Sequence, residues 1–218
     1  MPFKSLSQPR QRLADQVYAQ IMQAIRDGSI TSDQPIVQEK LADQFEISRT
    51  PVREALFRME QEGILTVTGR GSFRIRQLDM KEVSEMYGAR CAIEGYAARL
   101  LAETNDAATN QRLRQAITDA EDLSDNTVEA YFQANMAVHR AFVKEANNRF
   151  LLELFDNIWN RGSSFTMFAS IKSGELVKSL GDHMALVDAI ETGDGSTAAE
   201  TMISHIKDGR DLQVQAGR

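Results

Sequence analysis

One stretch decides how the N-terminal part of this chain folds: Ser48-Arg49-Thr50-Pro51-Val52-Arg53-Glu54-Ala55-Leu56. Val52, Leu56 and Met59 recur at positions i, i+4 and i+7, so they share one face of a helix. Pro51 suits the first turn of that helix, where its missing N–H breaks no helical hydrogen bond. We expect Arg49, Thr50, Arg53 and Phe57 to lie on a different face of the helix, which points outward. The sequence indicates no function for Phe57.

Two arginines and a threonine hydroxyl at the N-terminal end of a rigid helix suit contact with DNA, because such groups reach base edges and phosphates in the major groove. Two further helices precede this one. The first runs from Arg10 to about Asp27 with one apolar stripe and ends at Gly28, and the second runs from about Val37 to Phe45. A tight turn at Glu46-Ile47 then leads into the third helix. This arrangement predicts a helix-turn-helix with a recognition helix near residues 49–62.

From Ile64 to Arg76 the hydrophobic period changes to two, with Gly69-Arg70-Gly71 as a turn. That pattern predicts a β-hairpin. The glycines would let the tip approach DNA closely, so that Arg70 could enter a minor groove. The alternative is a solvated basic hairpin that only packs on the helices.

The segment from Lys40 to Leu65 resembles the winged helix-turn-helix of the GntR family of bacterial transcription regulators. The resemblance rests on Ser48–Leu56, on Lys40-Leu41-Ala42-Asp43-Gln44-Phe45-Glu46-Ile47 before it, and on Met59-Glu60-Gln61-Glu62-Gly63-Ile64-Leu65 after it. It implies double-stranded DNA as a partner, read by a homodimer whose two recognition helices enter successive major grooves of a palindromic operator. The DNA-binding residues would be Ser48, Arg49, Thr50, Arg53, Arg70 and Gly71.

The net charge of −6 does not exclude DNA binding, because it is unevenly distributed. Residues 1–76 contain 11 Lys and Arg against 9 Asp and Glu, a net charge of +2, whereas residues 77–218 contain 14 against 22, a net charge of −8. Residues 49–76 alone hold six arginines and three glutamates. A basic patch on one domain is enough for contact with phosphates.

The composition also indicates the compartment. Cys91 is the only cysteine, so no intrachain disulfide can form and a reducing cytoplasm is expected. The first eight residues lack the apolar core of a signal peptide. No run of 18 apolar residues occurs, so we expect no membrane span.

The remainder of the chain, from Leu78 onward, shows helical patterns broken by short polar segments and no convincing strand. About 140 residues are ample for six or seven helices. We therefore predict a mainly α protein with a winged helix-turn-helix domain at 1–76 and an all-helical domain at 77–218. The last residues, 208–218, lose apolar periodicity and are expected to be disordered.

All three histidines, His139, His183 and His205, lie in this helical part. Asn135 and His139 are four residues apart and share a helix face. His183 and His205 each fall on a separate amphipathic helix. Three imidazoles from three helices could converge on one divalent metal inside a bundle.

Residues 79–215 resemble the ligand-binding (FCD) domain of the FadR subgroup of the GntR family. The motifs are Asn135–Phe142, Asp182–Ile190 and Met202–Ile206. The resemblance implies a metal such as zinc or nickel on an aspartate and three histidines, with a small carboxylate effector completing its coordination. This chain has Asn135 in place of the aspartate, and a neutral amide oxygen is a poorer ligand for a transition metal.

Positively charged side chains could hold a carboxylate effector. Arg90 matches an arginine of such domains, and Glu94 lies one turn further on. Arg161, close to Trp159, is a further candidate. The alternative for Arg90 and Glu94 is an i, i+4 salt bridge at the surface or in a dimer interface.

Two functions compete. The first is a ligand-responsive transcription regulator, and the family resemblance implies that it is a repressor. The second is a metal-dependent enzyme acting on a small organic acid, since catalytic zinc is also held by three protein ligands with an open position. The sequence contains no His-Glu-x-x-His pair, no nucleophile–base constellation and no glycine-rich phosphate loop. The first function is therefore favoured. An architectural DNA-binding protein would leave the large acidic helical part unexplained.

Overall fold

The chain divides into two compact units, Met1–Gln77 and Leu78–Arg218. The computed structural model describes residues 9–123, 125–159, 164–165, 168, 177–178 and 180–216, and among these the side chains of all but 9–12, 26 and 214–216. Arg161, a candidate effector contact, lies outside the described residues. Each unit is described by itself below.

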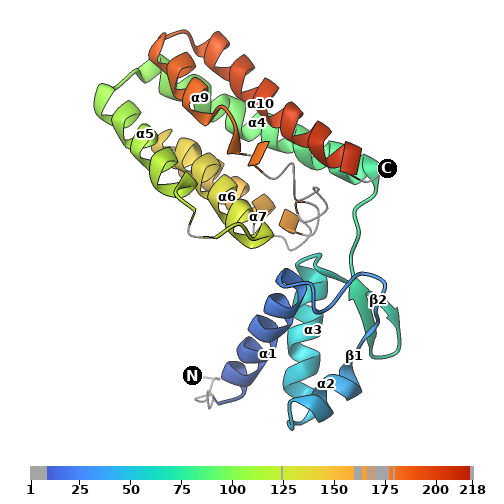
Figure 1. Cartoon of the computed structure of the whole chain (residues 1–218). Coiled ribbons are helices and arrows are strands. Elements are labelled where there is room, and N and C mark those ends of the chain that lie inside the picture. The colour runs from blue at the N-terminus through green and yellow to red at the C-terminus, as the bar shows by residue number, and fades with distance from the viewer. Residues whose placement is uncertain are drawn as a thin grey trace, which may run out of the picture. The chain divides into compact units, whose positions relative to one another are not determined.

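The first unit begins with three helices, α1 (Pro9–Arg26), α2 (Gln38–Gln44) and α3 (Arg49–Gln61) (Figure 1). The turn between α2 and α3 contains Glu46 in the left-handed region at φ 54°, and the Ile47 N–H donates to the Ala42 carbonyl oxygen over 3.1 Å. The three helices bury one apolar core, to which α1 contributes Val17, Ile21, Met22 and Ile25 and α3 contributes Val52, Ala55, Leu56 and Met59. The helix-turn-helix expected from the periodicity is confirmed.

A small antiparallel sheet completes this unit, with strand order β1-β3-β2. The strands are β1 (Ile36–Val37), β2 (Leu65–Gly69) and β3 (Ser72–Ile75). The hairpin β2–β3 is the predicted one, and we call it the wing. Gly71 closes its turn at φ 72°, a conformation that L side chains rarely adopt. Strand β1 was not predicted: Val37, expected to open a helix, instead pairs with Ser72.

The described residues of the second unit form helices joined by short loops and contain no strand. Two long helices, α4 and α10, lie side by side (Figure 1). Gly95 permits their close approach, because a Cβ atom there would lie 2.9 Å from Ile203 Cγ1. The helices are α4 (Met80–Thr104), α5 (Ala107–Glu121), α6 (Val128–Glu145), α7 (Arg149–Trp159), α9 (His183–Glu191) and α10 (Gly195–Ala216).

Local sequence signals explain where several of these helices begin. Asp79 and Glu82 form a capping box at the start of α4, with each side chain accepting a hydrogen bond from the other residue's N–H. Asp106 and Thr127 accept similar capping bonds at α5 and α6. The expectation of a disordered end over residues 208–218 was wrong for residues 208–216, since α10 continues to Ala216 and buries Gln213. Residues 217–218 lie outside the described residues.

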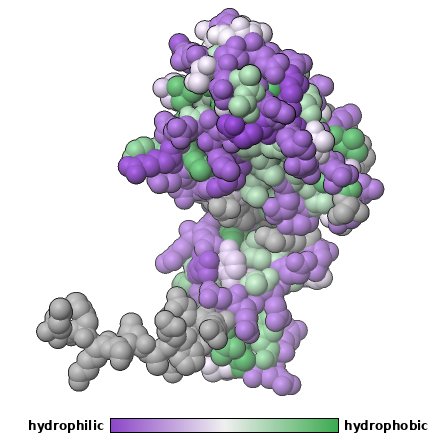
Figure 2. All heavy atoms as spheres, turned by 90° about the vertical axis from the view of Figure 1, so that its left-hand side faces the viewer, coloured by the Kyte–Doolittle hydropathy of each residue, from purple (hydrophilic) through white to green (hydrophobic). Residues whose placement is uncertain are grey.

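Figure 2 shows a face on which hydrophilic residues predominate and hydrophobic ones occur in small groups. Exposed large hydrophobic residues lie on several separate elements, among them Phe57 on α3, Tyr96 on α4 and Phe150 on α7. No helix in the described part of the chain is both long and apolar enough to cross a membrane.

Candidate functional site

The outward face of α3 carries the side chains expected there. Val52, Leu56 and Met59 are fully buried, whereas Arg49, Thr50 and Arg53 are exposed. Ser48 is the N-cap in an extended conformation, and its side chain makes no capping hydrogen bond with the described residues. The N-terminal turn of α3 therefore presents a hydroxyl and two guanidinium groups beside backbone N–H groups, a combination suited to phosphate.

Arg49 forms an ion pair with Glu39 of α2. Both side chains are more than half exposed, at 66% and 61%, so the pair contributes little to stability. Another anion can therefore replace Glu39 as the partner of Arg49. The pair holds the Arg49 guanidinium at the surface between α2 and α3.

A groove of about 720 Å³ separates the N-terminal half of α3 from the wing. Arg49 and Arg53 line it from α3, and Arg70 and Gly71 line it from the turn of the wing. Phe57 also lines it; its ring packs edge-on against Phe73 with centroids 5.8 Å apart. Ser48 and Thr50 do not line this groove.

In the second unit, His139 of α6, His183 of α9 and His205 of α10 converge; we call them the histidine cluster. One ligand atom of each lies within 4.8 Å of the others. His139 and His183 are 1% exposed. The buried His183 Nε2 has no hydrogen-bond partner among the described residues. Asn135, one turn before His139, is also buried.

Two of these imidazoles have a carboxylate close to their Nδ1 atoms. Glu121, the last residue of α5, lies with Oε1 2.7 Å from His183 Nδ1. Glu94 of α4 lies with Oε2 2.5 Å from His139 Nδ1. A carboxylate on Nδ1 fixes the tautomer of a histidine, so that Nε2 is left to act as a metal ligand. The Glu121 contact is of this kind.

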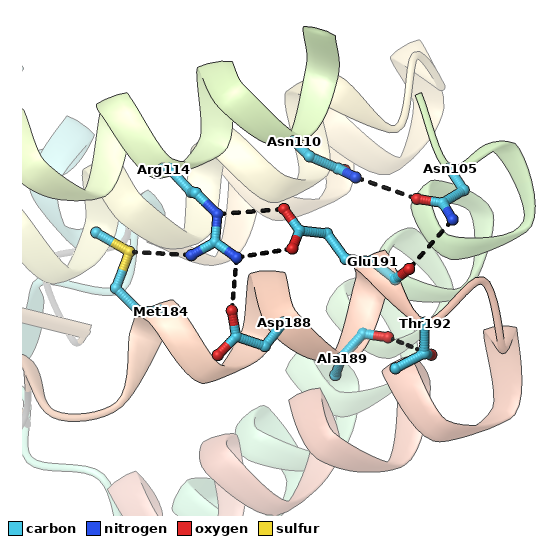
Figure 3. A network of polar contacts seen from close by, with 8 residues as sticks. All are labelled: Asn105, Asn110, Arg114, Met184, Asp188, Ala189, Glu191 and Thr192. Carbon is cyan, nitrogen blue, oxygen red and sulfur yellow. Dashed lines mark hydrogen bonds and ion pairs between the residues drawn. The ribbon is translucent and has the colours of Figure 1, made fainter. Parts of the chain in front are cut away.

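A polar network holds α9 against α5 (Figure 3). Arg114 of α5 forms ion pairs with Asp188 at 2.5 Å and with Glu191 at 2.8 Å, both on α9. At the end of the same helix pair, Asn105 Nδ2 donates to the Glu191 carbonyl oxygen over 3.2 Å. These contacts fix the position of α9, and with it His183, relative to Glu121.

Arg90 and Glu94 form a buried ion pair, with Nε and Oε1 2.8 Å apart and side chains 8% and 1% exposed. This excludes the alternative of a surface salt bridge. The Arg90 guanidinium also lies over the ring of Trp159, 4.4 Å from its centroid. Burial alone would raise the pKa of Glu94. The opposite effect of Arg90 and His139 is larger, so the pKa falls to about 2. Glu94 is therefore a permanent carboxylate at neutral pH.

A cavity of about 260 Å³ opens beside the histidine cluster. His139, His205, Asn135 and Arg90 line it, whereas Glu94 and His183 do not. Glu94 therefore contacts His139 but does not line the cavity. This corrects the expectation that Glu94 contacts an effector. Sequence reasoning missed several other residues that line the cavity: Met86, Phe132, Ile158, Trp159, Phe168, Lys178, Asp182, Asp208 and Gln213.

The imidazoles are neutral at physiological pH. Burial, followed by the neighbouring His139 and His205, lowers the pKa of His183 to about 2. Burial and His139 lower the pKa of His205 to about 3, and burial lowers that of His139. Neutral imidazole is the form that binds a metal.

These shifts predict that the metal-free protein loses stability in mild acid. In the unfolded chain histidines titrate near pH 6.5, so below that pH the unfolded state binds more protons than the folded state. The free energy of unfolding should therefore fall as the pH drops from about 6.5, by about 1.4 kcal/mol per pH unit for each histidine that stays neutral. Urea unfolding with a chelator present, followed by the fluorescence of the single tryptophan, Trp159, measures it. Equal unfolding free energies at pH 7.5 and 5.5 would contradict the prediction.

Comparisons with known proteins cover both units. The sequence model described as "Bacterial regulatory proteins, gntR family" matches residues 13–75, and the one described as "FCD domain" matches residues 85–208. The "Probable D-xylose utilization operon transcriptional repressor" of Paenarthrobacter nicotinovorans is 29% identical over 202 residues, which is 90% of this chain and 87% of that protein. The "Uncharacterized HTH-type transcriptional regulator YdhC" of Bacillus subtilis (strain 168) is 29% identical over 145 residues, 66% of this chain and 65% of that protein.

A solved structure, "E. coli McbR/YncC", resembles this one with a TM-score of 0.67 and covers 98% of this chain and 100% of that chain. At 20% sequence identity this likeness shows the fold alone.

Proposed function

This chain belongs to the GntR family of bacterial DNA-binding transcription regulators and carries an FCD domain, and from that premise we propose that it represses a catabolic operon until a small carboxylate metabolite binds beside a metal in its second unit. One observation carries the proposal: three neutral imidazoles, two of them buried and one partly buried, converge next to a cavity that a buried arginine also lines. This is the chemistry of a metal centre that takes an anion.

The DNA contacts are assigned to the first unit. Arg49 and Arg53 would contact base edges or phosphates from α3, with Ser48 and Thr50 on phosphate at its first turn. Arg70 and Gly71 would contact DNA from the tip of the wing. The support is that four of these residues line the groove between α3 and the wing, while all the arginines among them stay at the surface.

The metal is assigned to His139, His183 and His205, with Asn135 as a weaker fourth ligand or a hydrogen-bonding neighbour. Imidazole ligands suit several divalent transition metals, among them zinc and nickel, the two that the family resemblance implies. The residues fit such an ion, since His183 Nε2 is buried without a partner among the described residues and its Nδ1 is already paired with Glu121. When bound, the ion supplies a Lewis-acidic position for an effector carboxylate. Arg90 would hold the same carboxylate from the side.

The regulator would act in the cytoplasm as a homodimer bound to a palindromic operator. Effector binding in the second unit would change how the DNA-binding units of the two protomers are placed relative to each other, and operator binding would weaken as a result. The alternative of a metal-dependent enzyme is not supported, because the matched family and the relatives are DNA-binding regulators.

The test starts from full-length protein purified without added metal. Native mass spectrometry with elemental analysis should show a dimer with about one zinc or nickel ion per chain. Selection from genomic fragments should then yield a specific palindromic site, and small organic acids should weaken binding to it. Absence of specific DNA binding would overturn the regulator; specific binding that no acid changes would overturn the proposed effector response.

A further inference from the structure

Arg53, in the second turn of α3, differs from the other arginines of this helix in what holds its side chain. Arg49 and Arg58 each pair with a carboxylate. Arg53 makes no hydrogen bond or ion pair with the described residues. Its guanidinium instead lies over the ring of Phe57, with Cζ 5.4 Å from the ring centroid. This distance is within the range of a cation–π contact, which extends to about 6 Å.

Phe57 is itself held in place from below, although its side chain is 41% exposed. Its ring packs against Phe73 of strand β3, with centroids 5.8 Å apart and the two ring planes nearly perpendicular at 87°. Phe73 is 2% exposed and belongs to the core of the first unit. An aromatic side chain has few rotatable bonds, so a ring fixed on a buried neighbour is a rigid support. Phe57 follows Arg53 by one helical turn and lies on the same face of α3.

An aromatic partner leaves more of an arginine available to DNA than a carboxylate does. A carboxylate accepts hydrogen bonds from the guanidinium N–H groups, and DNA has to displace it. An aromatic ring attracts the cation through its face and accepts none of the in-plane N–H groups, which stay free for a base edge or a phosphate. Arg53 and Phe57 both line the groove between α3 and the wing. Arg53 is therefore held at this groove with all its donors available.

Holding an arginine in advance also favours binding. A free arginine side chain populates many rotamers, and ordering it in a complex costs conformational entropy. A side chain that is already restrained loses less entropy when DNA binds, so the same contact yields a higher affinity.

We propose that Phe57 is a positioning residue for DNA binding: its ring holds the Arg53 guanidinium at the groove before DNA binds, and Phe57 acts through Arg53. This inference rests on the proposed function, which assigns Arg53 to the DNA interface. It adds a role for Phe57, a residue for which the sequence indicated no function.

A double-mutant cycle between Phe57 and Arg53 tests the proposal. Fluorescence anisotropy measures the affinity of the full-length chain for the operator recovered by selection from genomic fragments. Phe57→Leu keeps an apolar side chain on Phe73 but removes the ring, and it should weaken binding about three- to tenfold, as expected for one long side chain that loses its restraint. In the Arg53→Ala background, the same substitution should change the affinity by less than about twofold. Phe57→Tyr keeps the ring and should bind within about twofold of the unmodified protein.

The matched control is Phe150→Leu. Phe150 is also exposed and also lies beneath an arginine, with Arg149 Cζ 4.8 Å from its ring centroid, but it belongs to α7 in the second unit. Its substitution should leave operator affinity unchanged. Phe57→Met repeats the cycle with a second apolar side chain if Phe57→Leu does not fold.

The cycle separates positioning of Arg53 from support of the wing, because a loss of wing structure would weaken binding whether or not Arg53 is present. An equal loss in both backgrounds would therefore overturn the proposal, as would an unchanged affinity in Phe57→Leu. Whichever property Arg53→Ala alters, salt slope or base preference, Phe57→Leu should alter in the same direction and to a smaller extent. A change only in the property that Arg53→Ala leaves intact would contradict the proposal.

Failure of this inference can be distinguished from failure of the proposed function. If the unmodified protein selects no specific site, the proposed regulator fails. If it binds a specific site and the cycle shows no coupling between Phe57 and Arg53, the regulator stands and only the role of Phe57 is lost.

Discussion

Replacing Arg49 with alanine should weaken binding to the operator by about 1–3 kcal/mol, roughly 5- to 150-fold. The Arg49 guanidinium lies exposed at the first turn of α3 and on the groove beside the wing, where an exposed ion pair with Glu39 competes only weakly with DNA for it. Arg53→Ala should have an effect of similar size, since it lies one turn further along the same face. Fluorescence anisotropy with labelled operator at fixed salt measures both.

Salt dependence then separates two modes of contact. An arginine that reads a base should, when removed, relax the preference for one base pair, whereas one that binds phosphate should weaken all sequences alike and reduce the salt slope by about one. Arg112→Ala is the matched control: Arg112 is exposed on α5 and pairs with Glu145 in the second unit. Operator affinity and selectivity that stay unchanged in Arg49→Ala would remove this residue from the interface.

Hydrophobic periodicity predicted the first unit well because its helices bury one face each. Val52, Leu56 and Met59 are buried as their spacing requires, and the charged residues between them are exposed. Strand β1 escaped prediction because two residues carry no period of their own. Its conformation comes from pairing with β3, a contact between residues 36 and 73 that no local pattern records.

The histidine cluster could be predicted only in part. The i, i+4 spacing joined Asn135 to His139, and the family resemblance joined the three histidines. Glu121 gave no local signal, since it lies 62 residues from His183 and reaches it through the packing of α5 against α9. The i, i+4 spacing of Arg90 and Glu94 predicted a salt bridge, but burial and the contact with His139 depend on how α4 packs against α6.

The C-terminal part of α10 shows a different limit. Residues 208–213 lack a clear apolar stripe because the cavity wall that they help to form is polar as well as apolar, with Asp208, Leu212 and Gln213 all lining it. A segment that lines a cavity can therefore resemble a disordered tail when hydrophobic periodicity is the only criterion.

His183→Ala should abolish stoichiometric metal binding and the response to effector, while operator binding without effector remains. Removing one of three imidazoles takes away a ligand whose Nε2 has no other partner among the described residues. We expect metal affinity to fall more than about 100-fold, beyond the 10- to 100-fold typical of losing an outer hydrogen bond. Competition with a chelating dye measures the affinity, and elemental analysis measures the content.

Glu121→Gln provides the graded comparison that distinguishes orientation of the ligand from its presence. The amide can still hold the His183 Nδ1–H through its oxygen but lacks the charge that makes the imidazole a stronger ligand, so metal affinity should fall by about tenfold. Asp119→Asn, an exposed carboxylate two residues earlier on α5, should change nothing. Normal metal content in His183→Ala would refute the cluster as a metal site. Equal affinity in Glu121→Gln and the unmodified protein would limit Glu121 to a structural contact between α5 and α9.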